Sequence, residues 1–324
     1  MIKNQWYAVL DSKKLKKNKP LALRRLTMDL IMIRYSDGTV SCFVDKCSHR
    51  GAKLSAGVMK GDCIRCPFHG IEFDREGKCV LVPASGQKSP DDFSRFNLKS
   101  IPVREIGSII FMWYGNDKPS SEPYMFDVLL DKHFSYSHLE DIWKVHYSRV
   151  IENQLDVSHL AFVHHNTIGR GGKTLCHGPK VVWIDDNTFQ TSANNEVDTG
   201  QLPKDADACV IKTTNLMFHF PNIWLNTVNE KIKIFAFFVP VDEETSILAV
   251  RFYNRITGCK PLDAFIAWLG KYANKIIERQ DKRVVETQQP VKSELRMTEN
   301  LVAADFPIIE YRSRRDALIN GKYT

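Results

Sequence analysis

Two short cysteine–histidine pairs constrain this chain more than any other feature. The first pair is Cys47-Ser-His49 and the second is Cys66-Pro-Phe-His69, with sixteen residues between them. Two thiolates and two imidazoles at this spacing can converge from two adjacent loops on one metal centre. A structural zinc ion takes such ligands, and so does a [2Fe–2S] cluster with two cysteines on one iron and two histidines on the other. A usual zinc finger places its cysteines first and its histidines second, whereas each pair here contributes one of each, which favours the cluster.

The residues around these pairs carry a resemblance to a known family. Cys47–Gly51 reads C-S-H-R-G and Cys66–Gly70 reads C-P-F-H-G. This pattern resembles the Rieske pattern of ring-hydroxylating oxygenases. The resemblance implies that Cys47 and Cys66 hold one iron and that His49 and His69 hold the other. Neutral imidazole ligands raise the reduction potential above that of a four-cysteine cluster.

One departure narrows the resemblance. Respiratory Rieske proteins carry two further cysteines that form a disulfide over the cluster, and those positions here are Ala52 and Phe68. The chain therefore resembles the oxygenase and ferredoxin branch. Cys63 precedes Cys66 in a C-x-x-C arrangement, and we interpret it as a bystander because Cys66 pairs better with His69.

A second group of candidate ligands lies in the segment 152–165. Asp156 and His159 are three positions apart, so a helix would place them on one face. His159 and His164 are five apart, roughly 140° around an ideal helix, so they can meet at one metal only if the helix ends or distorts between them. Taken alone, such a segment is an ordinary helix with a few solvated histidines.

A third ligand is predicted from a helix over residues 261 to about 286. Its apolar stripe is expected at Leu262, Phe265, Ile266, Leu269, Ala273, Ile276, Ile277 and Val284. Asp281 falls on this stripe, whereas Glu278 and Glu286 lie off it. A buried carboxylate is costly unless it is paired or binds a metal, so Asp281 is either a metal ligand or the partner of a buried arginine.

Beside a Rieske pattern, D-x-x-H-x4-H resembles the iron-binding signature of Rieske oxygenases. The resemblance implies that His159, His164 and Asp281 form the 2-His-1-carboxylate site of a mononuclear Fe(II). It also implies that Asp156 bridges this site to His69 of a neighbouring subunit and carries electron transfer. Asn153, one turn earlier, is expected to line the iron pocket.

The pattern of elements predicts an α+β protein with two domains. Residues 1–117 are rich in strand-like runs and are expected to form an all-β Rieske domain, with hairpins over 30–45 and 71–82. Residues 115–123 form a predicted linker. Residues 124–324 are expected to form a helix-grip-like catalytic domain, in which an antiparallel sheet holds the long C-terminal helix.

Composition restricts the partners. A net charge of +7, partly from the lysines of Lys13–Lys19, suits either a solvated loop or a docking surface for an acidic electron carrier. No nucleic-acid module and no apolar run long enough for a membrane span is present, and the N-terminus lacks a signal-peptide pattern. The cysteines outside the two pairs form no disulfide framework, which favours the cytoplasm.

We therefore expect a terminal oxygenase component similar to the α-only vanillate and dicamba O-demethylase oxygenases, which are typically homotrimers. The resemblance implies O2-dependent hydroxylation, dihydroxylation or demethylation of a small substrate, such as an aromatic or methylated compound. Electrons would come from NAD(P)H through a separate reductase or ferredoxin, because the sequence has no nucleotide-binding motif. The alternatives are a Rieske electron-transfer protein with a non-catalytic binding domain, and a binding protein with a structural zinc.

Overall fold

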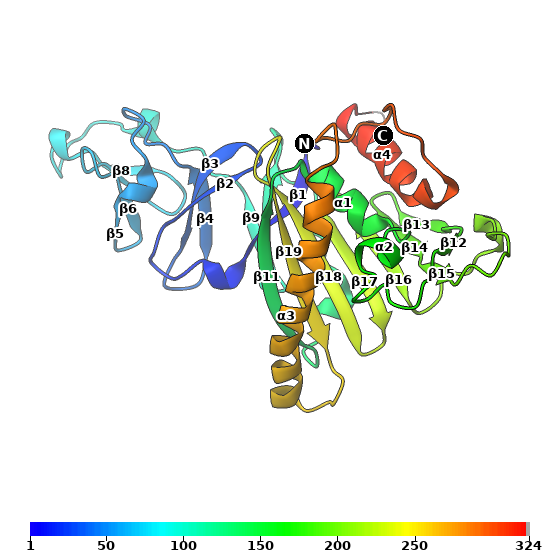
Figure 1. Cartoon of the computed structure of the whole chain (residues 1–324). Coiled ribbons are helices and arrows are strands. Elements are labelled where there is room, and N and C mark those ends of the chain that lie inside the picture. Colours follow the sequence, from blue (N-terminus) through cyan, green and yellow to red (C-terminus); the bar gives the residue numbers. More distant parts are fainter. Residues whose placement is uncertain (322–324) are drawn as a thin grey trace. The chain divides into compact units, whose positions relative to one another are not determined.

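The computed structural model describes residues 1–321 and confirms the expected α+β organisation (Figure 1). The chain divides into two units. One is Asn4–Tyr124, and the other joins Met1–Lys3 to the residues from Met125 onward. The first is built of strands and short 3-10 turns, whereas the second combines a large antiparallel sheet with helices.

The unit Asn4–Tyr124 consists of small antiparallel sheets with the strand orders β1-β10-β9, β2-β3-β4 and β5-β6-β7-β8. Their bounds are β1 Gln5–Asp11, β2 Leu21–Arg25, β3 Met28–Arg34, β4 Val40–Val44, β5 Val58–Lys60, β6 Cys63–Arg65, β7 Glu72–Phe73, β8 Cys79–Leu81, β9 Val103–Ile106 and β10 Ile109–Tyr114. The two hairpins expected from the sequence are β3–β4 and β7–β8. Strand β4 ends three residues before Cys47, and β7 begins three residues after His69, so both ligand loops are attached to hairpins.

The other unit is organised around a seven-stranded antiparallel sheet of order β11-β19-β18-β17-β16-β14-β13. Its bounds are β11 Ser135–Trp143, β13 Val181–Asp185, β14 Thr188–Ser192, β16 Asn215–His219, β17 Ile223–Asn229, β18 Ile232–Pro240 and β19 Ser246–Asn254. A separate pair joins β12 Leu175–His177 to β15 Asn194–Glu196. A turn at Phe220–Asn222 separates β16 from β17.

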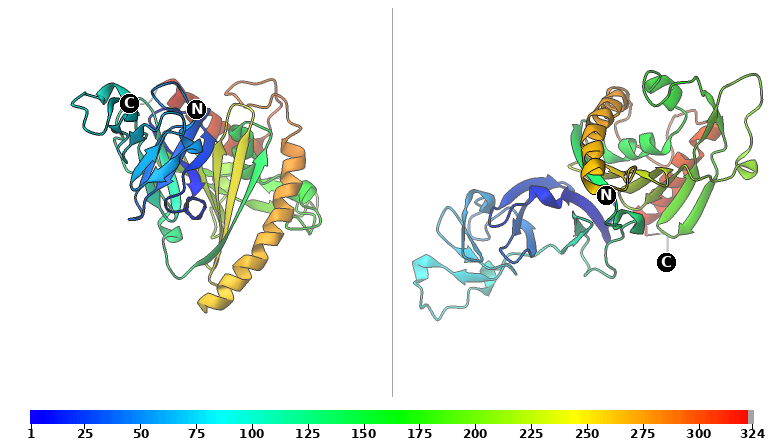
Figure 2. Two further views of the ribbon diagram at one scale, coloured as in Figure 1. Left: turned by 90° about the vertical axis from the view of Figure 1, so that its left-hand side faces the viewer. Right: turned by 90° about the horizontal axis from the view of Figure 1, so that it is seen from below.

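The helices of this unit are α1 Tyr147–Leu155, α2 Leu160–Val163, α3 Lys260–Val285 and α4 Phe306–Ile319. Figure 2 shows α3 running alongside the strands, and it packs against β11 and β19 at one edge of the sheet. An apolar core lies between the sheet and the helices and includes Val150, Phe218, Phe238, Val285 and Tyr311. Among the described residues, no helix has both the length and the apolar character needed to cross a membrane.

A buried ion network fixes α1 in the fold. Glu152 of α1 accepts two hydrogen bonds from Arg312 of α4, at 2.8 and 3.0 Å, and one from Arg149 at 3.1 Å. Arg149 also donates to the carbonyl of Pro290, and both arginines pair with Glu299. Removing one member of such a buried network leaves an uncompensated charge. The network therefore ties α1, which Asp156 follows, to α4.

The sequence-based assignment of the buried face of α3 is wrong. The expected stripe residues Leu262, Phe265, Leu269, Ile276 and Val284 are 42–54% exposed. The buried residues of the helix are Asp263, Ala267, Glu278, Asp281 and Val285. Asp281 is thus buried as expected, although most of the apolar stripe is exposed, and Glu278 is buried against expectation.

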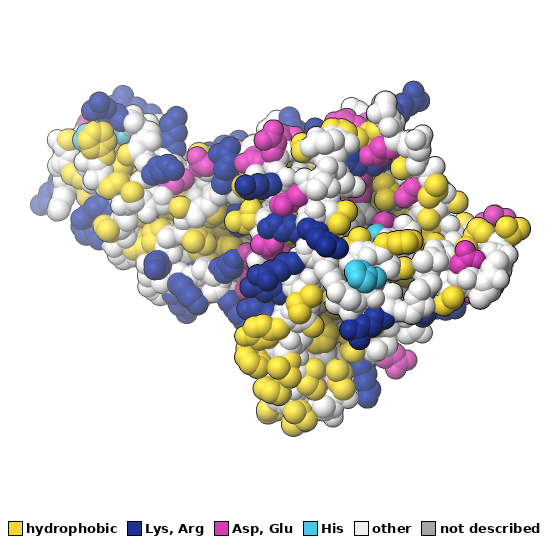
Figure 3. Space-filling view, in the orientation of Figure 1, with side chains coloured by type: hydrophobic (Ala, Val, Ile, Leu, Met, Phe, Trp, Pro, Cys, Tyr) yellow, Lys and Arg dark blue, Asp and Glu magenta, His cyan; other side chains and the backbone are white. Residues whose placement is uncertain are grey.

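Close packing accounts for the exposure of the large apolar side chains of α3. A side chain at Gly270 would meet the Phe252 ring of β19 at 2.8 Å, so small residues are required where α3 crosses the sheet. The larger apolar side chains consequently point outward. Figure 3 shows apolar side chains gathered over the N-terminal part of α3, where Leu262, Phe265, Trp268, Leu269, Tyr272 and Ile276 are all about half exposed. We refer to these six residues as the outward stripe.

Glu278 gives the fold a pH dependence that can be measured. Burial raises the pKa of Glu278 from 4.5 to about 8, with a further contribution from Asp141. Between these two values the folded state keeps a proton that the unfolded state has lost, so stability falls as the pH rises through this window. We expect Glu278→Gln to raise the melting temperature at pH 8 and to change it little at pH 5.

Thermal unfolding followed by circular dichroism at both pH values tests this expectation. Glu230→Gln, at an exposed glutamate, is the matched control and should leave the curve unchanged at both pH values. A Glu278→Gln protein with the wild-type pH dependence would show that Glu278 does not cause it.

Candidate metal sites

The two Cys–His loops are closed in the same way. The N–H of Gly51 donates to the carbonyl of Cys47 at 2.9 Å, and the N–H of Gly70 donates to the carbonyl of Cys66 at 3.1 Å. Both glycines have positive φ, 77° and 71°, a conformation in which a side chain would be strained. The glycine that ends each pattern therefore closes the turn that holds its cysteine.

The four side chains are divided between the core and the surface. Cys47 and Cys66 are 2% exposed and belong to the apolar core of their unit, whereas His49 and His69 are exposed. The two imidazole centroids lie 4.6 Å apart. Burial raises the pKa of Cys47, and so does the neighbouring Cys66 thiol. A pair of sulfur donors inside and a pair of nitrogen donors outside suits a cluster whose irons take different ligands.

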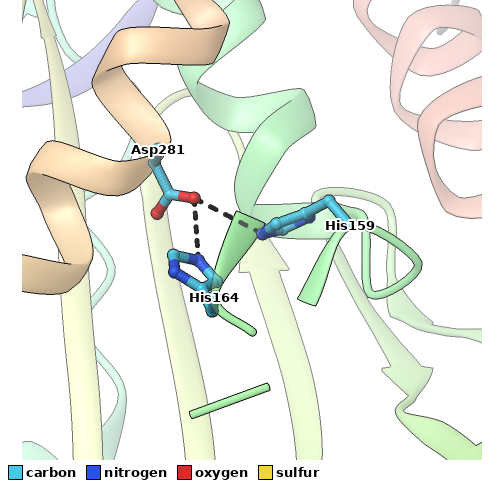
Figure 4. A group of neighbouring side chains, drawn as sticks. All are labelled: His159, His164 and Asp281. Carbon is cyan, nitrogen blue, oxygen red and sulfur yellow. Dashed lines mark ion pairs between the residues drawn. The ribbon is translucent and has the colours of Figure 1, made fainter. Parts of the chain in front are cut away.

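A second group of candidate metal ligands lies in the other unit. One atom each from His159, His164 and Asp281 lies within 4.8 Å of the others (Figure 4). Asp281 Oδ1 is 2.9 Å from His164 Nε2 and 3.4 Å from His159 Nε2. His164 and Asp281 are buried, and His159 is largely so. Two imidazoles and one carboxylate that converge in this way are the ligand set of non-haem Fe(II) sites.

Breaks in the helical backbone bring these residues together. Helix α1 ends at Leu155, and α2 spans only Leu160–Val163, so His159 precedes α2 and His164 follows it. The expectation that Asp156 and His159 share a helix face is therefore wrong, because both lie outside the helices. They still meet through the turn: Asp156 Oδ2 is 3.3 Å from His159 Nδ1. Asn195 of β15 anchors this turn by donating to the carbonyl of Val157 at 2.7 Å.

Asp281 provides the test of whether this site suits a metal. Its Oδ1 is buried and makes no hydrogen bond of regular geometry, although two imidazole nitrogens face it. A cation between the three groups would satisfy this oxygen. Burial raises the pKa of Asp281, but the two histidines outweigh burial and lower it. Burial lowers the pKa of His159, but Asp156 and Asp281 outweigh burial and raise it to about 9.

Asp156 and Asn153 lie beside this group. Ser158 donates its backbone N–H and its hydroxyl to Asp156 Oδ1, at 2.6 and 2.7 Å, which leaves Oδ2 facing His159. Asn153, on the last turn of α1, has a buried side-chain N–H2 that makes no hydrogen bond within the described structure. A buried amide donor without a partner is unusual in a folded protein and calls for an explanation.

Gln280 is a further residue at this site, and the sequence pattern did not predict it. Its side-chain carbonyl lies 2.8 Å from His164 Nδ1, on the side of the ring away from Asp281. The only indication of this contact in the sequence is that Gln280 precedes Asp281. The side chains of consecutive helix residues usually point in different directions, so this indication is weak. The contact depends on how α2 and α3 meet, which spacing along the chain does not reveal.

Comparisons with known families agree with the division of the chain. Residues 5–102 match the family described as the Rieske [2Fe-2S] domain. Residues 143–321, more than half of the chain, match the vanillate O-demethylase oxygenase C-terminal domain.

Individual relatives match over part of their length. The oxygenase component of dicamba O-demethylase from Stenotrophomonas maltophilia is 31% identical over 170 residues, which cover 50% of this chain and 48% of the relative. Cholesterol 7-desaturase nvd 1 from Ciona intestinalis is 33% identical over 165 residues, which cover 50% of this chain and 34% of the relative. The alignments thus span half or less of these relatives.

Solved structures match the whole fold at low identity. The Pseudomonas putida CBB5 protein NdmA superposes with a TM-score of 0.81 at 23% identity, covering 98% of this chain and 91% of NdmA. Apo dicamba monooxygenase superposes with a TM-score of 0.73 at 18% identity, covering 99% and 98% of the two chains. At such identities the likeness concerns the fold.

The cysteine assignment can be tested by comparing two cysteines of one strand–loop segment. We expect Cys66→Ser to abolish the visible absorption and acid-labile sulfide of a [2Fe–2S] cluster, because serine does not supply a thiolate. Cys63→Ser, three positions earlier, should retain both. Absorption spectra and sulfide assays of the two purified variants decide the matter, and loss of the cluster in both would give Cys63 a role that we do not assign.

Proposed function

Because the chain belongs to the Rieske oxygenases that carry the vanillate O-demethylase oxygenase C-terminal domain, we propose that it is the terminal oxygenase of a multicomponent system. Its reaction would be O2- and electron-dependent hydroxylation or oxidative O- or N-demethylation of a small organic substrate. The relatives' names include an O-demethylase and a desaturase, so the family name alone does not select the reaction.

One observation carries the proposal: a buried carboxylate faces two histidine nitrogens across a gap that a metal ion would fill. We assign His159, His164 and Asp281 as ligands of a mononuclear Fe(II), and Cys47, His49, Cys66 and His69 as ligands of the [2Fe–2S] cluster. Three protein ligands on one side leave coordination positions open, and the bound iron would supply O2 activation there.

Asp156 has a separate task in this proposal. Its Oδ1 is held by Ser158, and its Oδ2 faces the Nδ1 of His159, so it orients that imidazole without occupying the metal position. A carboxylate behind a ligand histidine fixes the tautomer and raises the basicity of the ring. We propose that Asp156 also bridges His159 to the partner subunit's His69 in a homotrimer and that electron transfer follows this route.

The substrate and the electron donor complete the proposed function. The unpaired amide of Asn153 would donate to the substrate or to a group near the metal. Electrons would come from NAD(P)H through a separate reductase or ferredoxin. The eight cysteines form no disulfide, which suits a reducing cytoplasm.

The alternative is a Rieske electron-transfer protein whose second domain only binds a small molecule. Such a protein would not need Asp281 to be buried against two imidazoles, because an unpaired buried carboxylate is destabilising. The buried group therefore favours the oxygenase.

Iron, zinc and acid-labile sulfide measured per chain on anaerobically purified protein test the proposal. About three iron to two sulfide is expected, one [2Fe–2S] cluster plus one mononuclear iron. Asp281→Ala should lower the ratio to about two to two without changing the cluster spectrum. A wild-type ratio of two to two after addition of Fe(II) would favour the electron-transfer alternative, and zinc without sulfide would exclude both readings.

Asp156→Asn separates electron transfer from metal binding. Asparagine keeps the shape of the side chain but removes its charge, so both metals should remain bound while reduction of the mononuclear site slows by at least about tenfold. The measurement is single-turnover oxidation of the pre-reduced cluster, followed by its absorbance in the presence of O2. An unchanged rate with both metals present would remove the bridging role of Asp156.

A further inference from the structure

We propose that Gln280 is a positioning residue for the mononuclear site: its side-chain carbonyl accepts the Nδ1–H of His164 and so directs the Nε2 of that ring toward Asp281. The inference rests on the proposed function, since it concerns the same metal site. It adds a residue to which neither the sequence pattern nor the family comparisons gave a role.

The geometry of the His164 ring carries the first step. Its Nδ1 lies 2.8 Å from Gln280 Oε1, and its Nε2 lies 2.9 Å from Asp281 Oδ1. The two nitrogens of the ring therefore face two consecutive residues of α3. An imidazole binds a metal through a nitrogen that carries no proton, so the other nitrogen must carry one and needs an acceptor. The Gln280 carbonyl is that acceptor.

The other contacts of Gln280 agree with an amide oxygen that faces His164. Its Nε2 donates to Asn166 Oδ1 at 2.7 Å, and its Oε1 accepts from the Thr167 hydroxyl at 2.8 Å. These contacts turn the amide oxygen toward the imidazole and the amide nitrogen away from it. Asn166 and Thr167 therefore hold the Gln280 side chain beside His164, in the orientation that offers its oxygen to the ring.

The turn that follows His164 is itself constrained. The N–H groups of Thr167 and Gly169 both donate to the carbonyl of His164, at 2.8 and 3.0 Å. A side chain at Gly169 would collide with the carbonyl of Leu160, so the tight path of this turn requires glycine. The ligand, its acceptor and the residues that orient the acceptor thus belong to one closed arrangement between the end of α2 and α3.

The two histidines differ in the group that faces their Nδ1 atoms. His159 has the carboxylate of Asp156 at its Nδ1, whereas His164 has the neutral amide of Gln280. A carboxylate raises the basicity of a ligand imidazole more than an amide does. The neutral group at position 280 therefore sets the orientation of His164 without adding a third negative charge beside Asp281 and Asp156.

Metal affinity, rather than turnover, is the measurement that tests this role. Equilibrium dialysis against Zn2+, with both compartments analysed by mass spectrometry, would compare cluster-loaded wild type with Gln280→Met, Gln280→Glu and Gln288→Met. Removal of a hydrogen-bond partner behind a ligand typically weakens metal binding about 10- to 100-fold, and we expect this for Gln280→Met. Gln280→Glu keeps an acceptor oxygen and should bind at least as tightly as wild type. Gln288→Met, at an exposed glutamine beyond α3, is the control and should match wild type.

Two comparisons make the outcomes decisive. Wild-type affinity in Gln280→Met, or equal loss in Gln280→Met and Gln280→Glu, would overturn the positioning role. Asp281→Ala measured in parallel separates this failure from failure of the proposed function: if wild type binds no more Zn2+ than Asp281→Ala, both proposals fall. Should Gln280→Met not fold by circular dichroism, Asn166→Ala takes its place. It frees the amide to rotate and should weaken binding, whereas unchanged affinity would overturn the proposal.

Discussion

A buried carboxylate is the constraint on which the arrangement of the second unit depends. Asp281 sits on the sheet-facing side of α3, where an ionised group is unfavourable unless positive charge or hydrogen bonds compensate for lost water. Two imidazoles, from a segment more than a hundred positions earlier in the sequence, face this carboxylate. The two histidines reach Asp281 because α1 ends at Leu155 and α2 spans only four residues. The buried pairing of Glu152 with Arg312 keeps the end of α1 in the required place.

Much of this organisation follows from the sequence, for physical reasons. The Cys–His pairs are local: each lies within four positions and is closed by its own glycine, so the spacing alone carries the geometry. Hairpins such as β3–β4 are also local, since a short polar turn joins two apolar runs. Asp281 was found because a carboxylate within an apolar stripe demands an explanation, although most of that stripe is exposed in the structure.

The remaining features depend on contacts that spacing does not encode. An apolar stripe predicts which face of a helix is buried only if the sheet beneath accepts large side chains, and at Gly270 it does not. Asp156 and His159 were expected to meet on a helix but meet in a turn, where the same separation in sequence gives a different geometry. The contact of Gln280 with His164 joins residues 116 positions apart and becomes visible only when both helices are in place.

The outward stripe has a consequence for handling the protein. Its six side chains, three of them aromatic, form a row between Leu262 and Ile276 of α3. Two basic residues, Arg279 and Arg283, follow on the helix. Contiguous exposed apolar surface of this kind promotes association. Electrostatic repulsion between the basic ends of such helices is screened as salt rises, whereas the apolar attraction is not. The chain therefore self-associates more readily in concentrated, high-salt samples than in dilute, low-salt samples. Ionic strength and protein concentration should be recorded with every measurement on it.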